Sequence, residues 1–372
     1  MLEHLLALNQ LPKIGPIRIR RLVDAFGSAE KVLSTRKDQL LRVDGIGPEL
    51  AGILSDWESH TDPAAELREL KERDLSVILP DDPAFPPALR EAYDCPLLLY
   101  VWGKIEERDR HAIGVVGTRR CSIYGKNSTK KLSFQLAHAG FTVISGLARG
   151  IDTTAHEAAI AAGGRTIAVI GSGLAKIFPA ENLPLAEMIA DGKGAVVSEF
   201  PLHTAPDKKT FPQRNRIVAA WSKALIVTES PLWSGSLITA NLASEYGRPI
   251  YAIPGPIDKP TSAGCNRLIR DGATLLTDGS ELLDDLSSLS FSGMTVPVMN
   301  AEDKTTSAPQ PDLPTLSEDE QTVFTALGEN ESGIDRIIEH TGLPTATVSA
   351  TLLKLEMKRL VRPLPGFRYI KR

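Results

Sequence analysis

Between residues 113 and 278, short apolar runs alternate with stretches expected to be helical, and this alternation limits the possible folds more than any other feature of the chain. Runs that are apolar throughout are typical of strands buried on both faces of a parallel sheet. The pattern predicts an α/β fold with an extended doubly wound, Rossmann-like parallel sheet as its core. Strands are expected near residues 112–116, 141–144, 166–170, 195–197, 224–227, 250–253 and 274–276, and helices near 125–139, 153–162, 183–190, 213–221, 237–246 and 266–271.

Three polar loops interrupt this alternation, and each joins glycine or proline to arginine. They are residues 117–120 (GTRR), 145–152 (SGLARGID) and 211–216 (FPQRNR). Because strand-to-helix turns of a parallel sheet gather at the carboxyl ends of the strands, helix amides and cationic side chains can hold anions there. Gly117 allows close approach of a ligand, Thr118 offers a hydroxyl and Arg119 can clamp a phosphate through two nitrogens. The loops therefore predict a phosphate-binding surface.

The third loop and the residues before it combine four cations with an aromatic ring and an amide. Lys208, Lys209, Arg214 and Arg216 surround Phe211 and Asn215. This composition suits single-stranded nucleic acid, because cations follow the backbone while any base can stack on the ring. We expect Phe211 to be exposed in a polar loop; the alternative is that it belongs to the core.

Evidence for catalysis in these loops is weak, since no obvious nucleophile and base accompany the arginines. Asp152 and His156 lie four residues apart and could orient an imidazole for acid-base chemistry. The favoured interpretation is that Asp152 caps a helix while His156 fills a polar niche. Neither Gly114 to Gly117 nor Gly171 to Gly173 completes a dinucleotide-binding fingerprint, so no cofactor is expected.

The flanking segments predict smaller domains, giving boundaries of 1–60, 61–288, 289–315 and 316–372. Residues 1–60 are expected to be all-helical, because residues 11–26 and 43–54 look like two helix-hairpin-helix elements of a SAM-like domain. The segment from Lys13 to Arg42 contains eight Lys or Arg residues and three Asp or Glu residues. DNA contact and a role in packing alone both remain open for this domain.

The central domain begins with a connecting unit, and the chain ends in a separate module. Residues 61–110 are rich in proline, and the apolar run at 97–102 is a candidate for an added strand. Residues 289–315 have the composition of a mobile linker. Three predicted helices (317–327, 333–341 and 344–358) and a hairpin (360–363 with 367–370) then indicate a winged helix. Binding of DNA and binding of protein both remain open for this module, and residues 345–353 of its recognition helix contain no Lys or Arg.

Composition places limits on the cellular setting. The net charge of -4 means that any nucleic-acid contact depends on a local basic surface. The three cysteines include no close pair, which argues against a zinc site or disulfide framework and favours a reducing cytoplasm. The apolar runs are far shorter than the roughly 20 residues of a membrane span, so no membrane association is expected.

The ordered motifs as a set resemble the DNA-processing protein A family, also called DprA or Smf. They are the three loops, Ala155-His156, Phe178-Pro179 with Asn182, and Pro254-Gly255. The resemblance covers residues 75–285. It implies a cytoplasmic, homodimeric bacterial protein that binds single-stranded DNA without sequence specificity during natural transformation and helps load the RecA recombinase. It also implies no reaction of the protein's own.

The same resemblance assigns roles to individual positions. Arg119 matches the family's phosphate-clamping arginine, Lys208 and Phe211 its basic and stacking pair, and Arg214 and Arg216 its arginine motif. Arg149 stands where relatives often have Lys or Arg. Relatives often carry a lysine near Phe178-Pro179, where this chain has Ala180 and Glu181.

A different class of function is a nucleotide-processing hydrolase of the lysine-decarboxylase-like group, which shares this sheet plan. Glu199 or Glu245 would serve as its acid. The glycine-rich loop that such hydrolases require is absent, and residues 231–236 resemble it only loosely.

Overall fold

The computed structural model describes residues 1–288, 317–327, 332–358, 360–364 and 368–371. The chain divides into two compact units, Met1–Val298 and Met299–Arg372. The predicted linker at 289–315 lies outside the described residues. None of the helices in the described ranges combines the length and apolar character that crossing a membrane requires.

In the described residues, one nine-stranded sheet runs in the order β1-β2-β6-β5-β4-β3-β7-β8-β9. Strands β3 to β9 are mutually parallel, which confirms the predicted sheet. Their bounds are β3 (Ala112–Val116), β4 (Thr142–Ser145), β5 (Thr166–Val169), β6 (Gly194–Ser198), β7 (Ala224–Val227), β8 (Ile250–Ala252) and β9 (Thr274–Leu275). The added strand is also confirmed: β2 (Leu99–Gly103) pairs antiparallel with β6. A further strand, β1 (Ser76–Ile78), pairs antiparallel with β2 and was not predicted.

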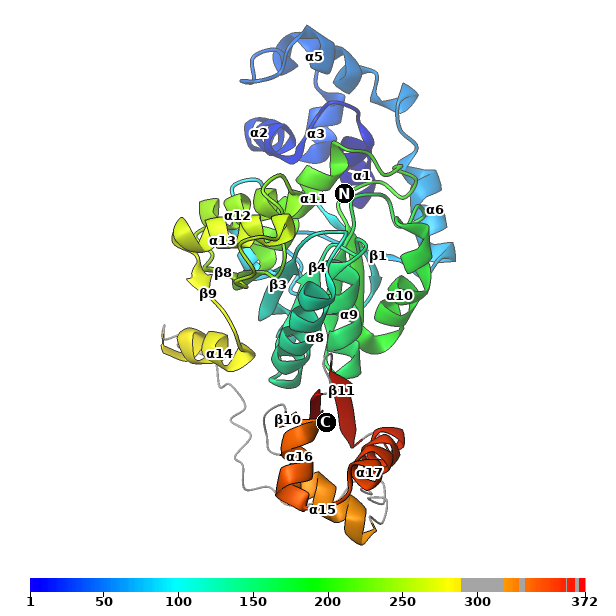
Figure 1. The fold of residues 1–372 in the computed structure, drawn as a ribbon. Helices are drawn as coiled ribbons and strands as arrows, with labels where there is room; N and C mark the ends of the chain where they lie inside the picture. The colour runs from blue at the N-terminus through cyan, green and yellow to red at the C-terminus, as the bar shows by residue number, and fades with distance from the viewer. Residues whose placement is uncertain (289–316, 328–331, 359, 365–367, 372) are drawn as a thin grey trace. The chain divides into compact units, whose positions relative to one another are not determined.

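Helices cover both faces of the sheet, as the doubly wound pattern requires (Figure 1). One face packs against α8 (Ile123–His138), α9 (Ile151–Ala161) and α14 (Gly279–Ser288), through side chains such as Leu132, Ala155 and Leu282. The other packs against α11 (Thr210–Trp221), α12 (Gly235–Glu245) and α13 (Ala263–Arg270), through Val218, Ala240 and Cys265. Towards β2, the sheet is covered by α6 (Pro63–Glu72) and α10 (Leu183–Met188).

The direction in which the chain builds the sheet reverses between β3 and β7. From β3 the strands β4, β5 and β6 follow outward on one side, whereas β7, β8 and β9 follow outward on the other. The loops after β3 and β7 therefore diverge and leave a crevice at the carboxyl ends of these two strands. This switch point is where a ligand site is expected in such a sheet.

The amino-terminal segment is helical, as predicted, with α1 (Leu2–Gln10), α2 (Pro16–Phe26), α3 (Ala29–Ser34), α4 (Lys37–Leu40) and α5 (Pro48–Ser55). Helices α2 and α5 each begin with proline after a glycine, where the missing N–H costs no hydrogen bond. Leu6 of α1 shares an apolar cluster with Leu70 and Tyr100, so these helices belong to the compact unit that holds the sheet.

The carboxyl-terminal unit has the predicted three helices and hairpin of a winged helix. They are α15 (Glu318–Ala326), α16 (Ile334–Thr341), α17 (Thr345–Met357), β11 (Val361–Leu364) and β12 (Arg368–Lys371). A short strand, β10 (Ser332–Gly333), completes a three-stranded sheet in the order β10-β12-β11. Val323, Ile337 and Leu352 form part of its core.

Candidate nucleic-acid interface

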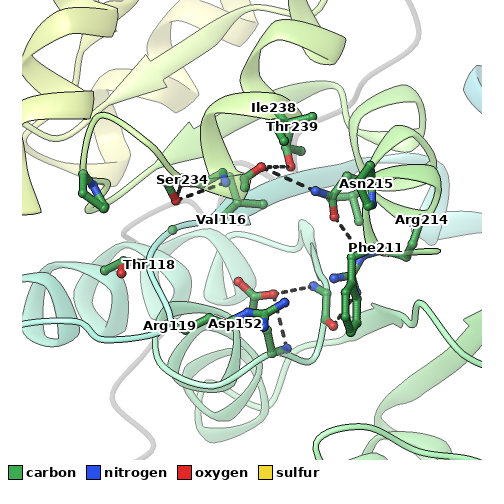
Figure 2. Close-up of a pocket in the computed structure, with 18 of the residues that line it drawn as sticks. Val116, Thr118, Arg119, Asp152, Phe211, Arg214, Asn215, Ser234, Ile238 and Thr239 are labelled. Atoms are coloured by element: carbon green, nitrogen blue, oxygen red, sulfur yellow. Dashed lines mark hydrogen bonds between the residues drawn. The ribbon is translucent and has the colours of Figure 1, made fainter. Parts of the chain in front are cut away.

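A cavity of about 650 Å³ opens at the switch point between β3 and β7 (Figure 2). Its walls are the loops after β3, β4 and β7 together with the first turns of α11 and α12. Figure 2 shows Phe211 and Arg119 on one side of it, and Ser234 and Thr239 on the opposite side. The structure thus brings together residues from all three of the predicted loops.

The loop after β3 is fixed by its glycine and by a backbone contact to the β7 side. A Cβ on Gly117 would lie 2.6 Å from the Ile151 side chain and 2.8 Å from the Glu229 carbonyl oxygen, so only glycine fits. The Thr118 N–H donates to that same carbonyl at 2.8 Å. Arg119 is consequently held at the cavity, exposed, and it forms no ion pair with a carboxylate within the described residues.

The loop after β4 wraps around a buried carboxylate. The Oδ2 atom of Asp152 accepts the N–H groups of Gly146 at 3.1 Å and Ala148 at 3.3 Å. The predicted helix cap is therefore wrong: Gly150 occupies the N-cap position of α9, and Asp152 stabilises the loop before it. Burial raises the pKa of Asp152, and the nearby charge of Arg214 opposes that rise.

Arg214 lies beneath the cavity as a buried cation. It is 5 % exposed, and its Nη1 donates to the carbonyl oxygens of Gly146 and Val169. Burial lowers the pKa of Arg214 to about 10, so the group still carries its charge at neutral pH. A Cβ on Gly146 would lie 2.5 Å from the guanidinium, which explains why glycine occupies that position. Arg214 thus stabilises the cavity floor.

His156 fills a polar niche, as predicted. Its Nε2 accepts the Leu147 N–H at 3.3 Å, and its Nδ1 lies 2.6 Å from the Thr166 hydroxyl oxygen. That hydroxyl donates to the Val143 carbonyl at 2.7 Å, so His156 donates from Nδ1. Burial lowers the pKa of His156 to about 3, which keeps the ring neutral and unsuited to acid-base work.

Phe211 is placed differently from the prediction. Helix α11 begins at Thr210, so Phe211 lies in its first turn and is half-buried, not exposed in a polar loop. Its ring centroid is 5.0 Å from the Arg119 guanidinium carbon and 5.8 Å from the ring centroid of Phe178. The ring also covers Gly171, whose position has no room for a side chain. Phe211 therefore forms a wall of the cavity.

The remaining predicted residues divide between the cavity and other places. Lys208 lines the cavity, whereas Lys209 is exposed just outside its lining. The Asn215 amide nitrogen donates to the Gly235 carbonyl at 3.4 Å and joins α11 to the start of α12. Arg149 is exposed but forms a two-pronged ion pair with Glu181.

Arg216 does not reach the cavity, and its predicted place in the basic surface is corrected. Residues two apart on a helix point about 200° apart, so Arg214 and Arg216 lie on opposite sides of α11. Arg216 is buried, paired with Glu199 and 3.8 Å from Asp94. Burial raises the pKa of Glu199 to about 7; Arg216 opposes this rise and Asp94 adds to it.

Sequence reasoning missed Trp233 at this site, and it named Phe178 only as part of the motif set without assigning it to the site. Phe178, 40 % exposed, follows β5, and Trp233, 92 % exposed, follows β7 and lines the cavity. Both are aromatic side chains in polar loops after predicted strands, which is a usable signal. Ser234 caps α12 by accepting the Ser236 N–H at 3.3 Å.

The geometry offers little for a hydrolase. Glu199 and Glu245 are both absent from the cavity lining, and its carboxylate is Asp152, whose Oδ2 already accepts two amides. Among the described residues, no cluster of His, Cys, Asp and Glu has an arrangement that could hold a metal ion.

A protein-family model described as DNA recombination-mediator protein A matches residues 76–287. The chain belongs to this family. A second model, described as the DprA winged helix domain, matches residues 307–366. Both matches agree with the resemblance inferred from the motifs.

Relatives of the recombination-mediator family extend the similarity over nearly the whole chain. Protein Smf of Synechocystis sp. is 34% identical over 390 residues, which cover 99% of this chain and 98% of that protein. DNA processing protein DprA of Streptococcus pneumoniae is 43% identical over 202 residues, covering 54% of this chain and 71% of that protein.

Two solved structures of the family share the fold. The X-ray structure of DprA from Streptococcus pneumoniae has a TM-score of 0.67 and 32% identity, and covers 77% of this chain and 98% of that one. DNA processing protein A from Helicobacter pylori has a TM-score of 0.52 and 30% identity, and covers 57% of this chain and 96% of that one. The Helicobacter pylori structure was described for the single-stranded DNA binding mode of that protein.

Proposed function

We propose that this protein binds single-stranded DNA in the cavity between β3 and β7, without sequence specificity. The observation that carries the proposal is the convergence of Arg119 and Lys208, from separate turns, on a cavity walled by Phe211. Unpaired cations can follow the phosphates while a base stacks on the ring, whatever its identity. Membership of the recombination-mediator family and the binding mode described for the Helicobacter pylori protein support this function.

Binding exchanges one contact of Phe211 for another. In the free protein the Arg119 guanidinium covers the ring, a cation–π contact worth about 0.5–1 kcal/mol at an exposed site. A base stacked in its place contributes about 1–3 kcal/mol, so the exchange favours the base. The displaced guanidinium then becomes available to a phosphate, to which it donates strong charge-assisted hydrogen bonds.

The surrounding residues have supporting roles. Gly117 and Thr118 hold the β3 loop in place, Asn215 links the two helices at the cavity wall, and Arg214 adds positive potential from below the floor. Lys209 adds to the positive field near Lys208. Arg149 can leave its partner Glu181 and join the phosphates, because water screens the charges of this exposed pair.

Family membership leads us to extend the proposal to the cellular process. The bound strand is handed to the RecA recombinase, the protein acts as a homodimer in the cytoplasm, and it catalyses no reaction of its own. RecA assembly on DNA coated with single-strand binding protein tests this part: faster assembly with the protein present is expected, and an unchanged rate contradicts it.

Fluorescence anisotropy with an oligo(dT) strand, a mixed-sequence strand and a duplex of equal length tests the binding function. The two single strands should bind with similar affinity and more tightly than the duplex, because only unpaired bases can reach Phe211. Equal or tighter binding of the duplex would show that the cavity does not recognise unpaired bases.

A further inference from the structure

Trp233 is the most exposed tryptophan of the chain. It is 92 % exposed, whereas Trp221 is fully buried and Trp57 and Trp102 are partly buried. A tryptophan side chain can bury about 150–250 Å² of surface, so one left in water provides a large flat surface for a ligand. Trp233 also lines the cavity that contains Arg119 and Phe211.

The loop that carries Trp233 is anchored at both ends. Before it, the Ser230 carbonyl accepts the Gly264 N–H at 2.8 Å, and the Ser230 hydroxyl oxygen accepts the Ser236 hydroxyl at 2.9 Å. A Cβ on Gly264 would lie 2.6 Å from that carbonyl oxygen, so the two segments approach as closely as glycine allows. After it, Ser234 caps α12. Residues 231–233 are therefore a short span between fixed points, which reduces the entropy lost when a ligand binds.

Trp233 and Phe211 reach the cavity from different elements, the loop after β7 and the first turn of α11. Figure 2 shows Ser234, the residue after Trp233, across the pocket from Phe211. The lining also contains Arg119, Arg120 and Lys208. Aromatic surfaces from two separate elements of a cationic cavity match a polyanion that carries flat apolar groups at intervals, which is the chemistry of an unpaired polynucleotide.

We propose that Trp233 stacks on a second base of the bound strand, beyond the base that stacks on Phe211. This inference rests on the proposed function and adds to it a second stacking residue. Two stacking residues make the cavity a site for a stretch of strand, because each aromatic residue takes a different nucleotide.

Two substitutions of Trp233 separate stacking from simple apolar contact. Trp233→Leu keeps an apolar side chain but removes the planar ring, whereas Trp233→Phe keeps a ring. Anisotropy titrations with oligo(dT) should show affinity reduced about 5- to 150-fold for Trp233→Leu and mostly retained for Trp233→Phe. Ile257→Ala is the matched control, because Ile257 is 98 % exposed on the loop after β8 and lies outside the cavity lining.

A strand of equal length with abasic sites supplies the second arm, since it carries the phosphates without the bases. Trp233→Leu should bind this strand as the unaltered protein does. Oligo(dT) should also quench tryptophan fluorescence, and Trp233→Phe should remove most of that quenching, because the other three tryptophans are at least partly buried.

The outcomes distinguish failure of this inference from failure of the proposed single-strand binding function. If Trp233→Leu binds oligo(dT) normally while Phe211→Leu does not, the cavity binds single strands without Trp233, which overturns the inference alone. An equal loss on the abasic strand overturns stacking as its role. If the unaltered protein shows no preference for single strands, the proposed function fails and this inference fails with it.

Discussion

The cavity between β3 and β7 and the helical hairpins of residues 1–60 contain the same ingredients, glycine turns beside Lys and Arg, but they differ in how the charges are neutralised. In the hairpins, Lys13 pairs with Glu49, and Arg21 pairs with Asp44 at 2.7 Å. At the cavity, Arg119 and Lys208 form no ion pair within the described residues. A count of Lys and Arg in the hairpins therefore overestimates the positive charge that they can offer to DNA. Acidic residues of the facing hairpin already form ion pairs with some of these cations.

Burial is the second difference between the two regions. The side chains of Lys13 and Glu49 are 62% and 67% exposed, so water already screens their charges. Arg214 and Asp152, below the cavity, are both nearly excluded from water. Charges in the hairpins can be changed with little effect, whereas those beneath the cavity are part of the fold.

The largest predicted effect comes from removing the buried cation. Arg214→Ala leaves Asp152 without its compensating charge and should lower the free energy of unfolding by about 3–5 kcal/mol. Arg21→Ala, which breaks an exposed hairpin pair, should cost about 1 kcal/mol or less. Urea unfolding followed by tryptophan fluorescence measures both, because all four tryptophans lie in the Met1–Val298 unit. Similar losses for the two variants would remove the distinction between the regions.

A second effect is expected at Glu199, which follows β6 and contacts α1: the Glu199 carbonyl oxygen accepts a hydrogen bond from the Asn9 side-chain amide at 3.0 Å. The pKa of Glu199 is raised from 4.5 to about 7, so the folded protein holds a proton there that the unfolded chain releases. Stability should therefore fall as pH rises from about 4.5 to 7. Relative to the unaltered protein, Glu199→Gln should gain up to about 3 kcal/mol across that range.

Urea unfolding at several pH values measures this difference, with Glu245→Gln, an exposed carboxyl of α12, as the control. A stability difference that stays flat with pH, or that favours the unaltered protein as pH rises, would mean that Arg216 keeps Glu199 ionised.

The third effect separates the two regions by their affinity for DNA. Arg119→Ala should weaken single-strand binding about 10- to 100-fold, the range expected when a charged hydrogen bond to phosphate is lost. The loss should be similar for different sequences, since phosphates carry no base information. The hairpin control is Arg18→Ala, an exposed residue outside the cavity, which should leave affinity nearly unchanged. A greater loss of affinity for Arg18→Ala than for Arg119→Ala would indicate that single strands bind to the hairpins and not in the cavity.

Much of the fold could be predicted because its signal lies within short segments. The apolar run at 112–116 coincides with β3, since a strand buried on both faces must be apolar throughout. The three residues of β1 are too few to give a pattern. Helix α11 begins three residues before its predicted start at residue 213, because Pro212 lies in the first turn of the helix, where proline is tolerated.

The site was predictable in composition but not in the partners of its charges. Arg119, Lys208 and Phe211 meet because the strand order places their loops together, and the loop pattern indicated this. The pairing of Arg216 with Glu199 and Asp94 depends on residues distant in sequence, so no local pattern reveals it. Trp233 lies in the loop after β7, and the sequence alone does not show that β7 is the neighbour of β3. Without that strand order, nothing indicated that Trp233 would line the same cavity as Arg119.

The salt dependence of single-strand binding tests the central claim most directly, because each neutralised phosphate releases counterions. The logarithm of the affinity for oligo(dT) is measured against the logarithm of salt concentration for the unaltered protein, Arg119→Ala and Arg18→Ala. Arg119→Ala should reduce the slope by about 0.7, the contribution of one phosphate contact on a single strand, and Arg18→Ala should not change it. A slope unaffected by Arg119→Ala, or reduced by Arg18→Ala, would contradict phosphate binding in the cavity.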